Sequence, residues 1–455
     1  MEIINFYNRE EELKILEKVK NPIAIIYGRR RVGKTTLVLK FCEKRDFIYF
    51  FVNPKKPENL LIEEFFELLK KKVKIEEYVR PKNWEEFFSL LFEKYKGIVV
   101  FDEFQWFLKI NPEVPFIIQK FIDTKKPRII ILGSVIGMIK KLFEEESSPL
   151  FKRANIIIKL EPFNYKTVFK ILEDVGVKDL EEKVKFYLIF GGIPYYYTLI
   201  SSYKIKSLED AIKFLVFQPN AILKNEVEDI FRESFGKDYR THFSILLAIG
   251  LGKTKLEEIA SFASLQKTSL MPYIYDLKDL LEVIEERKIF GKKRKYYALK
   301  DYFFKFWFRY VFKNSERLIV DWKNVFEEVK KDLNNYFGIV FEDFAREFLI
   351  EKLKEGKISF TKIEKFIGYY REKNERKRFE IDIVCIDEKN DELLFFEVKW
   401  KDLKEKEVEE ILKDMERKTS YIQKKKVYGI IAKKIENKEK FRKKGYKLFD
   451  LEDLW

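Results

Sequence analysis

One stretch of the sequence has the residue types and spacing of a phosphate-binding turn. Residues 28–35 read GRRRVGKT, which matches G-x-x-x-x-G-K-[ST]. The glycines allow the backbone to wrap so that successive N–H groups and a helix N-terminus point at phosphate oxygens. Lys34 would bridge the β and γ phosphates, and the Thr35 hydroxyl would bind Mg²⁺. The residues expected to hold the nucleotide here are Gly28, Arg29, Arg30, Arg31, Val32, Gly33, Lys34, Thr35 and Thr36.

Two acidic residues follow another apolar run of strand length. Residues 98–101 (IVVF) lead directly into Asp102 and Glu103. A carboxylate at the carboxyl end of a parallel strand can hold Mg²⁺ through water, as we expect of Asp102. Glu103 lies one residue further along, where it can polarise the water that attacks a γ-phosphoryl group. Alone, such a pair is also typical of a strand that meets a solvated loop, so the interpretation depends on the upstream turn.

Two further side chains could act on the γ-phosphate. Ser134 comes just after the apolar run 129–132, where a hydroxyl can reach the phosphate from the side of the attacking water, or equally cap the next helix. Arg153 is a candidate for the arginine that neutralises charge in the transition state, with a solvated surface arginine as the alternative. It would act in its own subunit or, in an oligomer, in a neighbour's.

A third group of residues suggests a second metal site. Asp382, Glu397 and Lys399 lie in two strand-like segments, where residues two apart share a face, so Glu397 and Lys399 point the same way. Glu342 would add a ligand from an adjoining helix. Such carboxylates can hold Mg²⁺ against a scissile phosphate and lower the pKa of the attacking water. A solvated sheet face is the alternative.

The element pattern around the turn predicts an α/β domain. Apolar runs at residues 22–27, 47–52, 98–101 and 129–132 alternate with helical segments, which indicates a parallel sheet. Asn8 followed by Glu11 predicts a helix that starts at Arg9 and runs to Val19.

The remainder of the chain has a different pattern. Residues 161–235 are helical, with a turn at Gly191, Gly192 and Pro194. Three helices and two short strands around the turn 290–294 then give the plan of a winged helix. From residue 337 helices and strands alternate to the end. Two basic runs, 291–295 (GKKRK) and 371–378 (REKNERKR), predict contacts with DNA phosphates, although such charged segments can also be merely solvated.

Composition limits the function classes. The 455 residues are 46% hydrophobic and 16% aromatic, which is enough for several cores, and the net charge of +15 suits a polyanionic partner. One histidine and two cysteines exclude Ser-His-Asp triads, multi-histidine metal centres and a disulfide framework. Since no apolar stretch reaches the ~18 residues that span a bilayer, we expect a cytoplasmic protein with no membrane partner.

Several of these motifs, in this order, resemble the archaeal ATPase family of the AAA+ and STAND type. Besides GRRRVGKT, the resemblance rests on DEFQ from Asp102, GSVIG around Ser134 and the aromatic block after Asp301, together with FYNREE (6–11), PLFKR (149–153) and GGIP (191–194). The segment with Asp382 and Glu397 is similar to the PD-(D/E)XK nuclease-like fold. Lys152 stands where the ATPase family usually has glycine, and Ile381 where the nuclease fold has proline.

The resemblance implies ATP and Mg²⁺ as cofactors, Asn8 and Arg9 in an adenine-side box, and Pro194 against the base at the hinge of a lid. It implies an α/β fold made of a P-loop ATPase core (1–160), a helical lid (161–235), a winged helix (236–312) and a PD-(D/E)XK nuclease-like domain (313–455). The expected function is an ATP-hydrolysing enzyme that couples nucleotide state to a module acting on DNA. The alternative is a non-catalytic ATP-dependent switch or scaffold whose degenerate nuclease-like domain binds DNA or protein.

Overall fold

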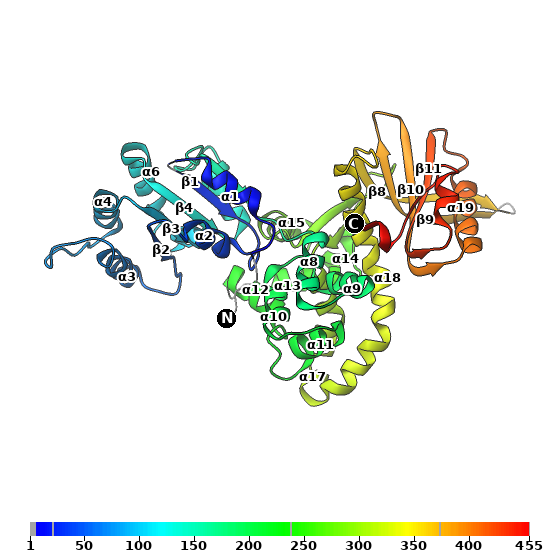
Figure 1. The fold of residues 1–455 in the computed structure, drawn as a ribbon, viewed down its shortest axis with the longest axis horizontal. Helices are drawn as coiled ribbons and strands as arrows, with labels where there is room; N and C mark the ends of the chain where they lie inside the picture. The colour runs from blue at the N-terminus through cyan, green and yellow to red at the C-terminus, as the bar shows by residue number, and fades with distance from the viewer. Residues whose placement is uncertain (1–5, 21, 237–238, 373–374, 455) are drawn as a thin grey trace. The chain divides into compact units, whose positions relative to one another are not determined.

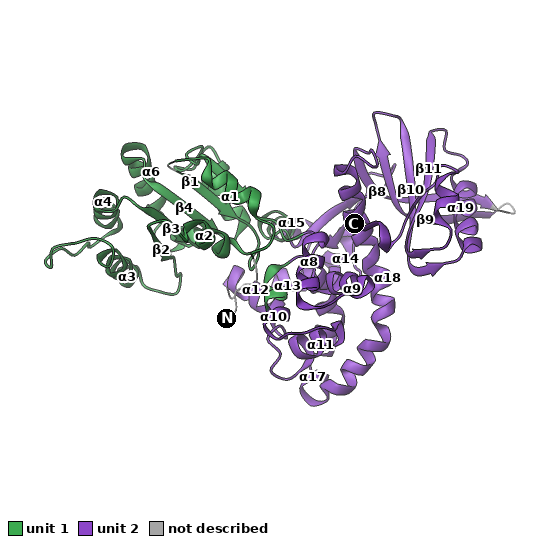
Figure 2. Cartoon of the chain, in the orientation of Figure 1, with its two compact units in different colours: residues 1–163, 193–198, 274–282 green, residues 164–192, 199–273, 283–455 purple. Residues whose placement is uncertain are grey.

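The computed structural model describes residues 6–20, 22–236, 239–372 and 375–454. Its helices and strands are shown in Figure 1. The chain forms two compact units (Figure 2). Unit 1 comprises residues 1–163, 193–198 and 274–282, and unit 2 comprises residues 164–192, 199–273 and 283–455.

Unit 1 is built on a five-stranded parallel sheet of order β2-β3-β4-β1-β5. The sheet confirms the predicted α/β fold. Sequence patterns did not reveal β5, a short strand at the sheet edge in which buried and exposed residues alternate. The strands are β1 (Ile23–Tyr27), β2 (Phe47–Phe51), β3 (Ile98–Asp102), β4 (Arg128–Gly133) and β5 (Ile156–Lys159).

Two separate cores cover the faces of this sheet, because side chains alternate along each strand. Ile26 and Val100 face a core completed by the first two helices, whereas Ile25 and Phe101 face a larger, phenylalanine-rich core formed with the others. The helices are α1 (Glu10–Glu17), α2 (Lys34–Cys42), α3 (Glu58–Lys70), α4 (Trp84–Lys94), α5 (Phe107–Ile110), α6 (Val114–Lys125) and α7 (Ile136–Glu144).

The start of α1 differs from the prediction. The helix begins at Glu10 with Arg9 as its N-cap, and no side chain caps it. Asn8 has φ +45°, a left-handed conformation, and so cannot be the β-region cap that the Asn8–Glu11 spacing predicted. The reason lies in Arg9, whose buried side chain is fixed by contacts with distant residues, described below.

The first part of unit 2 is helical, as predicted for residues 161–235. Between residues 239 and 299 it contains three helices and an antiparallel hairpin, in the predicted order. The helices are α8 (Tyr165–Val175), α9 (Leu180–Phe190), α10 (Pro194–Ser202), α11 (Leu208–Ile212), α12 (Glu226–Phe235), α13 (Tyr239–Gly250), α14 (Leu256–Phe262) and α15 (Lys267–Tyr275), and the hairpin is β6 (Ile284–Lys288) with β7 (Lys295–Leu299). Residues 193–198 and 274–282 pack with unit 1 instead, which local patterns cannot reveal.

The C-terminal part of unit 2 is a mixed sheet of order β12-β11-β10-β9-β8, in which β10, β11 and β12 are parallel and β8 and β9 antiparallel to their neighbours. The strands are β8 (Lys362–Glu372), β9 (Glu375–Asp387), β10 (Glu392–Leu403), β11 (Lys425–Ile435) and β12 (Lys447–Phe449). The helices that pack against the sheet are α18 (Trp322–Lys354), α19 (Glu405–Thr419) and α20 (Lys438–Arg442), whereas α16 (Tyr302–Phe306) packs against α9 and α17 (Arg317–Val320) against α18.

The apolar block from Tyr302 to Phe312 is used as core, with side chains such as Phe304 and Phe308 fully buried. None of the helices within the described ranges combines the length and the apolar character that crossing a bilayer requires.

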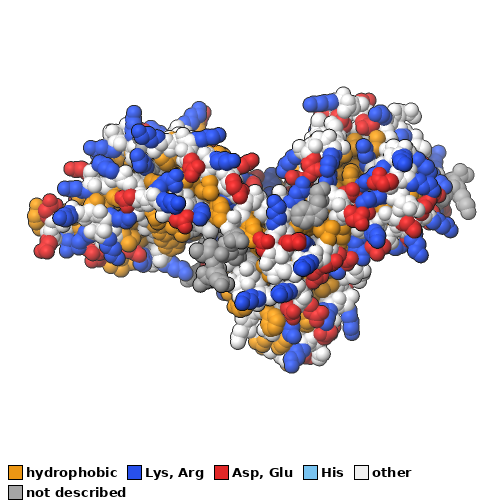
Figure 3. Space-filling view, viewed as in Figure 1, with side chains coloured by type: hydrophobic (Ala, Val, Ile, Leu, Met, Phe, Trp, Pro, Cys, Tyr) orange, Lys and Arg blue, Asp and Glu red, His pale blue; other side chains and the backbone are white. Residues whose placement is uncertain are grey.

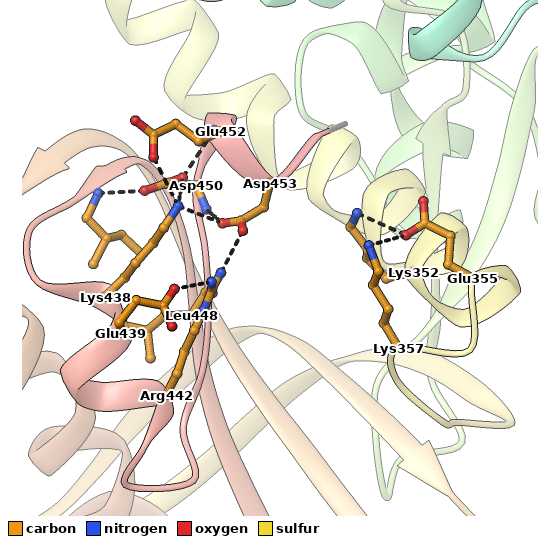
Figure 4. A network of polar contacts seen from close by, with 11 residues as sticks. Lys352, Glu355, Lys357, Lys438, Glu439, Arg442, Leu448, Asp450, Glu452 and Asp453 are labelled. Carbon is orange, nitrogen blue, oxygen red and sulfur yellow. Dashed lines mark hydrogen bonds and ion pairs between the residues drawn. The ribbon is translucent and has the colours of Figure 1, made fainter.

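Buried charges fix the C-terminal end of the chain to α20. Lys438 and Arg442 point from this helix toward Asp450 and Asp453 (Figure 4). Lys438 Nζ lies 2.7 Å from the carboxylate of Asp450, whose side chain is only 2% exposed. The same carboxylate accepts a hydrogen bond from the backbone of Ile435.

Replacing Asp450 with alanine would leave the Lys438 ammonium partly unpaired in a buried position. We expect Asp450→Ala to lower the free energy of unfolding by about 3 kcal/mol, measured by urea titration of the full chain. Glu452→Ala is the control, because the Glu452 side chain is 72% exposed while contacting the same lysine. Equal stability of the two variants would contradict this assignment.

Candidate functional site

The phosphate-binding turn joins β1 to α2, as predicted. A Cβ atom on Gly28 would lie 2.3 Å from the Leu160 carbonyl oxygen, and Gly33 has φ +92° as the N-cap of α2. The two glycines are therefore needed for different reasons, close packing and a left-handed backbone. The other residues predicted to hold the nucleotide lie on this turn and the start of α2, with Val32 buried, Arg29 and Arg31 partly buried, and Arg30 and Thr36 exposed.

Lys34 is buried inside the turn. Its ammonium donates hydrogen bonds to the carbonyl oxygens of Gly28 (2.9 Å) and Arg29 (3.0 Å). Burial lowers the pKa of Lys34, and the carboxylates of Glu103 and Asp102 act in the opposite direction. A bound phosphate would supply the negative charge that this buried ammonium requires.

Thr35 and Asp102 lie together at the start of α2 and the end of β3. The Thr35 hydroxyl donates to Asp102 Oδ2 at 2.8 Å. Tyr49 on β2 donates to the same oxygen at 2.5 Å, a partner that the sequence did not reveal. Burial, and then the Asp102 charge, raise the pKa of Tyr49, so its phenol stays a donor. A hydroxyl beside a carboxylate fits the oxygen ligands that Mg²⁺ prefers.

Glu103 is held in an unusual conformation beside Ser134. Its φ is +56°, in the left-handed region that non-glycine residues rarely occupy. The Glu103 carboxylate accepts hydrogen bonds from Ser134 Oγ (2.6 Å) and from Gln105 Nε2 (2.5 Å). Because β4 lies between β1 and β3, Ser134 at its carboxyl end falls between the turn and Glu103. Backbone strain of this kind is concentrated at functional sites.

Arg9 packs against the other side of the turn. Its guanidinium donates to the carbonyl oxygens of Glu161 (2.7 Å) and Val32 (3.4 Å) and lies 4.7 Å from the centre of the Phe163 ring. Burial lowers the pKa of Arg9. The predicted adenine-side residues Asn8 and Arg9 are thus joined to the turn through Arg9. Their contact with a base stays a prediction.

Pro194 belongs to unit 1 by packing and starts α10. Its neighbour Tyr195 lies under the Arg31 guanidinium, 4.1 Å from the ring centre. This contact brings the predicted hinge residue close to the phosphate-binding turn. No local sequence pattern pointed to Tyr195, which is far from the turn along the chain.

Arg153 lies away from these side chains. It forms a bidentate ion pair with Asp123 (2.9 and 3.0 Å) and donates to the Pro149 carbonyl oxygen. Its role as a charge-neutralising arginine stays a prediction, and the ion pair would have to open first. Lys152 has φ +54°, which explains why glycine suits this position in the resembling family.

The predicted C-terminal acids Asp382 and Glu397 lie on adjacent strands. The β8–β9 register shifts at residues 364–366, where β9 carries one extra residue, and the β9–β10 ladder ends at Ile383. Such a bulge redirects side chains. The Asp382 carboxylate accepts a hydrogen bond from the Val398 backbone at 2.8 Å. Lys399 lies 2.7 Å from Glu397 and 3.7 Å from Asp382, so its ammonium bridges the two acids.

Glu342 on α18 faces the same group. Burial and then the Asp382 charge raise the pKa of both Glu342 and Glu397 to about 7. Within the described ranges, however, no three acidic, histidine or cysteine side chains are arranged to hold a metal ion. That Glu342, Asp382 and Glu397 hold a metal ion stays a prediction, and the ammonium of Lys399 lies close to both strand acids.

The comparisons with known proteins agree with the turn and its surroundings. Residues 6–200 match a family described as an ATPase domain predominantly from Archaea, and residues 307–411 match one described as Archaea bacterial proteins of unknown function. Over 472 residues, 99% of this chain and 100% of the relative, the chain is 36% identical to the uncharacterized protein MJECL04 of Methanocaldococcus jannaschii. It is 51% identical over 47 residues, 10% of this chain and 80% of the relative, to the uncharacterized ATP-binding protein MJ0423 of that organism.

A solved structure shares the fold. The Walker-type ATPase PABY2304 of Pyrococcus abyssi matches with a TM-score of 0.52 and 20% identity, over 67% of this chain and 96% of that chain. The nuclease-like and winged-helix interpretations stay predictions. Since the archaeal relative matches nearly the whole chain, and the ATPase domain family spans the phosphate-binding turn, the chain belongs to the archaeal ATPase family.

Proposed function

We propose that this ATPase hydrolyses ATP at the carboxyl end of the unit 1 sheet and that its nucleotide state controls a DNA-binding role of unit 2. The hydrogen-bonded set of side chains at the ends of β3, β4 and the turn supports the first part. Thr35 contacts Asp102, and Ser134 contacts Glu103. These four groups come from three separate segments and converge where a γ-phosphate would follow the turn.

Each side chain has a distinct task in the proposed reaction. Lys34 and the backbone N–H groups of the turn bind the phosphates. Mg²⁺, held by the Thr35 hydroxyl and through water by Asp102, would neutralise phosphate charge. Glu103 orients and polarises the attacking water, while Ser134 and Gln105 fix its carboxylate.

Removing the charge of Glu103 separates binding from hydrolysis. We expect Glu103→Gln to lower the ATP hydrolysis rate by about 100-fold or more while ATP affinity stays within a few-fold. Lys34→Ala should instead weaken ATP binding itself. Phosphate release and nucleotide titration measure the two effects. Glu93→Gln, at an exposed position, is the matched control. If Glu103→Gln hydrolyses ATP as fast as Glu93→Gln, Glu103 has no part in the mechanism.

A packed segment offers a route from the nucleotide to unit 2. Helix α7 starts two residues after Ser134, and residues 274–282 pack against it. A Cβ atom on Gly137 would lie 1.7 Å from Leu280, and Glu282 contacts Lys159 at 2.7 Å. The chain then continues directly into β6 of unit 2. A shift of α7 at Ser134 would therefore move the segment that leads into the hairpin.

Whether unit 2 cuts DNA is a separate question. The Lys399 bridge between Asp382 and Glu397 favours the alternative, a scaffold that binds without cutting. If Mg²⁺ displaces this lysine, wild type should nick supercoiled DNA, and Asp382→Ala should lose all metal-dependent nicking. Nicking that persists in Asp382→Ala would exclude Asp382 from the cleavage site. If wild type does not nick DNA, the scaffold interpretation is supported.

The raised pKa values make stability depend on pH. A carboxyl group with a folded pKa of about 7 stabilises the fold below its unfolded value, near pH 4.5, and this contribution disappears as the pH rises through about 7. We expect the free energy of unfolding of the metal-free protein to fall between pH 5 and 8. Glu397→Gln should reduce this fall by about 2 kcal/mol in urea titrations. Glu410→Gln, at an exposed position, should leave this fall unchanged. The same pH dependence of unfolding free energy in wild type, Glu397→Gln and Glu410→Gln would contradict the raised pKa of Glu397.

A further inference from the structure

Two basic runs that are far apart in the sequence meet at one edge of the C-terminal sheet. Ile289, after β6, forms a parallel bridge with Lys365 of β8, and the Phe290 backbone donates to the Lys365 carbonyl oxygen at 2.9 Å. The Phe290 ring packs 5.7 Å from that of Phe366. The start of the predicted wing is thus fixed along β8, the last strand of the sheet.

Both runs converge on Tyr369, a β8 residue that is 41% exposed. Lys292, from the first run, lies with its Nζ 5.6 Å from the ring centre. Arg376, from the second run, lies with its guanidinium 4.2 Å from the same centre. In the β8–β9 ladder Arg376 is directly opposite Arg371.

Several cations at this edge form no close ion pair with a carboxylate among the described residues. Like charges directly opposite in a ladder are destabilising, as for Arg371 and Arg376. Lys292, Lys293 and Arg294 are exposed, and across the described part of the chain no carboxylate forms an ion pair with them. By contrast, neighbouring lysines are compensated, since Lys295 pairs with Glu286 and Lys365 with Glu380. Figure 3 shows lysine and arginine side chains spread among aspartate and glutamate over the visible face of the molecule.

We propose that this edge, formed by Lys292, Tyr369, Arg371 and Arg376, binds the phosphate backbone of double-stranded DNA. The proposal rests on the proposed DNA-binding role of unit 2. Single-strand binding proteins stack bases on free aromatic faces, but here the partly exposed Tyr369 ring already contacts two of the protein's own cations, Lys292 and Arg376. A row of cations around such a ring suits the regularly spaced phosphates of a duplex.

The position of the edge connects it to the candidate acids. Arg376 and Asp382 are six residues apart on β9, about 20 Å along a strand. This is the length of about six base steps of duplex. DNA that lies along β9 from the basic edge would therefore pass Asp382.

The test measures binding of a fluorescein-labelled duplex of about 24 base pairs by anisotropy, without nucleotide and at several salt concentrations. We expect Arg371→Ala/Arg376→Ala to bind about tenfold more weakly, with the slope of log affinity against log salt reduced by about 2. Lys292→Ala/Lys293→Ala, which changes only the exposed β6–β7 turn, should weaken binding and reduce the salt slope to a similar extent. This second variant keeps the test valid if the arginine substitutions disturb the pairing of β8 with β9. Lys313→Ala/Lys323→Ala removes the same charge from exposed positions elsewhere and should change both quantities far less.

The outcomes distinguish the edge from the wider proposal. If wild type binds the duplex and the edge variants bind no more weakly than the Lys313→Ala/Lys323→Ala control, the edge is not the binding surface. If wild type prefers the single strand or RNA of the same sequence, the duplex assignment is wrong. If wild type binds no nucleic acid while ATP binding is intact, the DNA-binding role itself fails.

Discussion

A buried ammonium group governs the nucleotide site. Lys34 lies within the turn, and its only hydrogen-bond acceptors among the described residues are the neutral carbonyl groups of Gly28 and Arg29. Burial disfavours the charged form, so the site is incomplete without an anion. Because electrostatic attraction is strong where water is excluded, a triphosphate gains more here than at an exposed lysine. The same turn requires the close approach of Gly28 to the Leu160 backbone, which leaves no room for a side chain. Both the fold of the turn and its affinity for nucleotide therefore depend on glycine at this position.

The strand order explains why the remaining polar groups meet. With β4 between β1 and β3, the ends of three adjacent parallel strands present the turn, Ser134 and Glu103 side by side. The left-handed backbone of Glu103 turns its carboxylate toward Ser134, and the two hydrogen bonds that it accepts offset the cost of this conformation. A site assembled from strand ends is held in place by the sheet, and in the proposed function this would let Ser134 respond to the loss of one phosphate group.

The features that could be predicted are those encoded locally. Strand length, the glycine spacing and the acids after residue 101 each depend on neighbouring residues, and parallel strands bring their carboxyl ends together. Tyr49, Gln105 and Tyr195 were missed because their roles depend on register or on contacts between distant segments. The cap at Asn8 was wrong for the same reason, since distant contacts of Arg9 override a local signal. In the C-terminal sheet the alternation correctly placed Glu397 beside Lys399, but nothing local revealed that this lysine would bridge to Asp382.

The proposed connection between nucleotide and DNA depends on the short chain segment between Glu282 and Ile289. Glu282 is held to Lys159 in unit 1, and Ile289 is paired with β8 of the C-terminal sheet. The six residues between them, 283–288, make seven Cα–Cα steps that span at most about 25 Å, and five of these residues form β6, which is paired along its length with β7. A paired strand cannot absorb displacement as a flexible linker would. Under the proposed function, movement at Glu282 would reach the hairpin through this short link, and Lys292 lies in the turn of that hairpin.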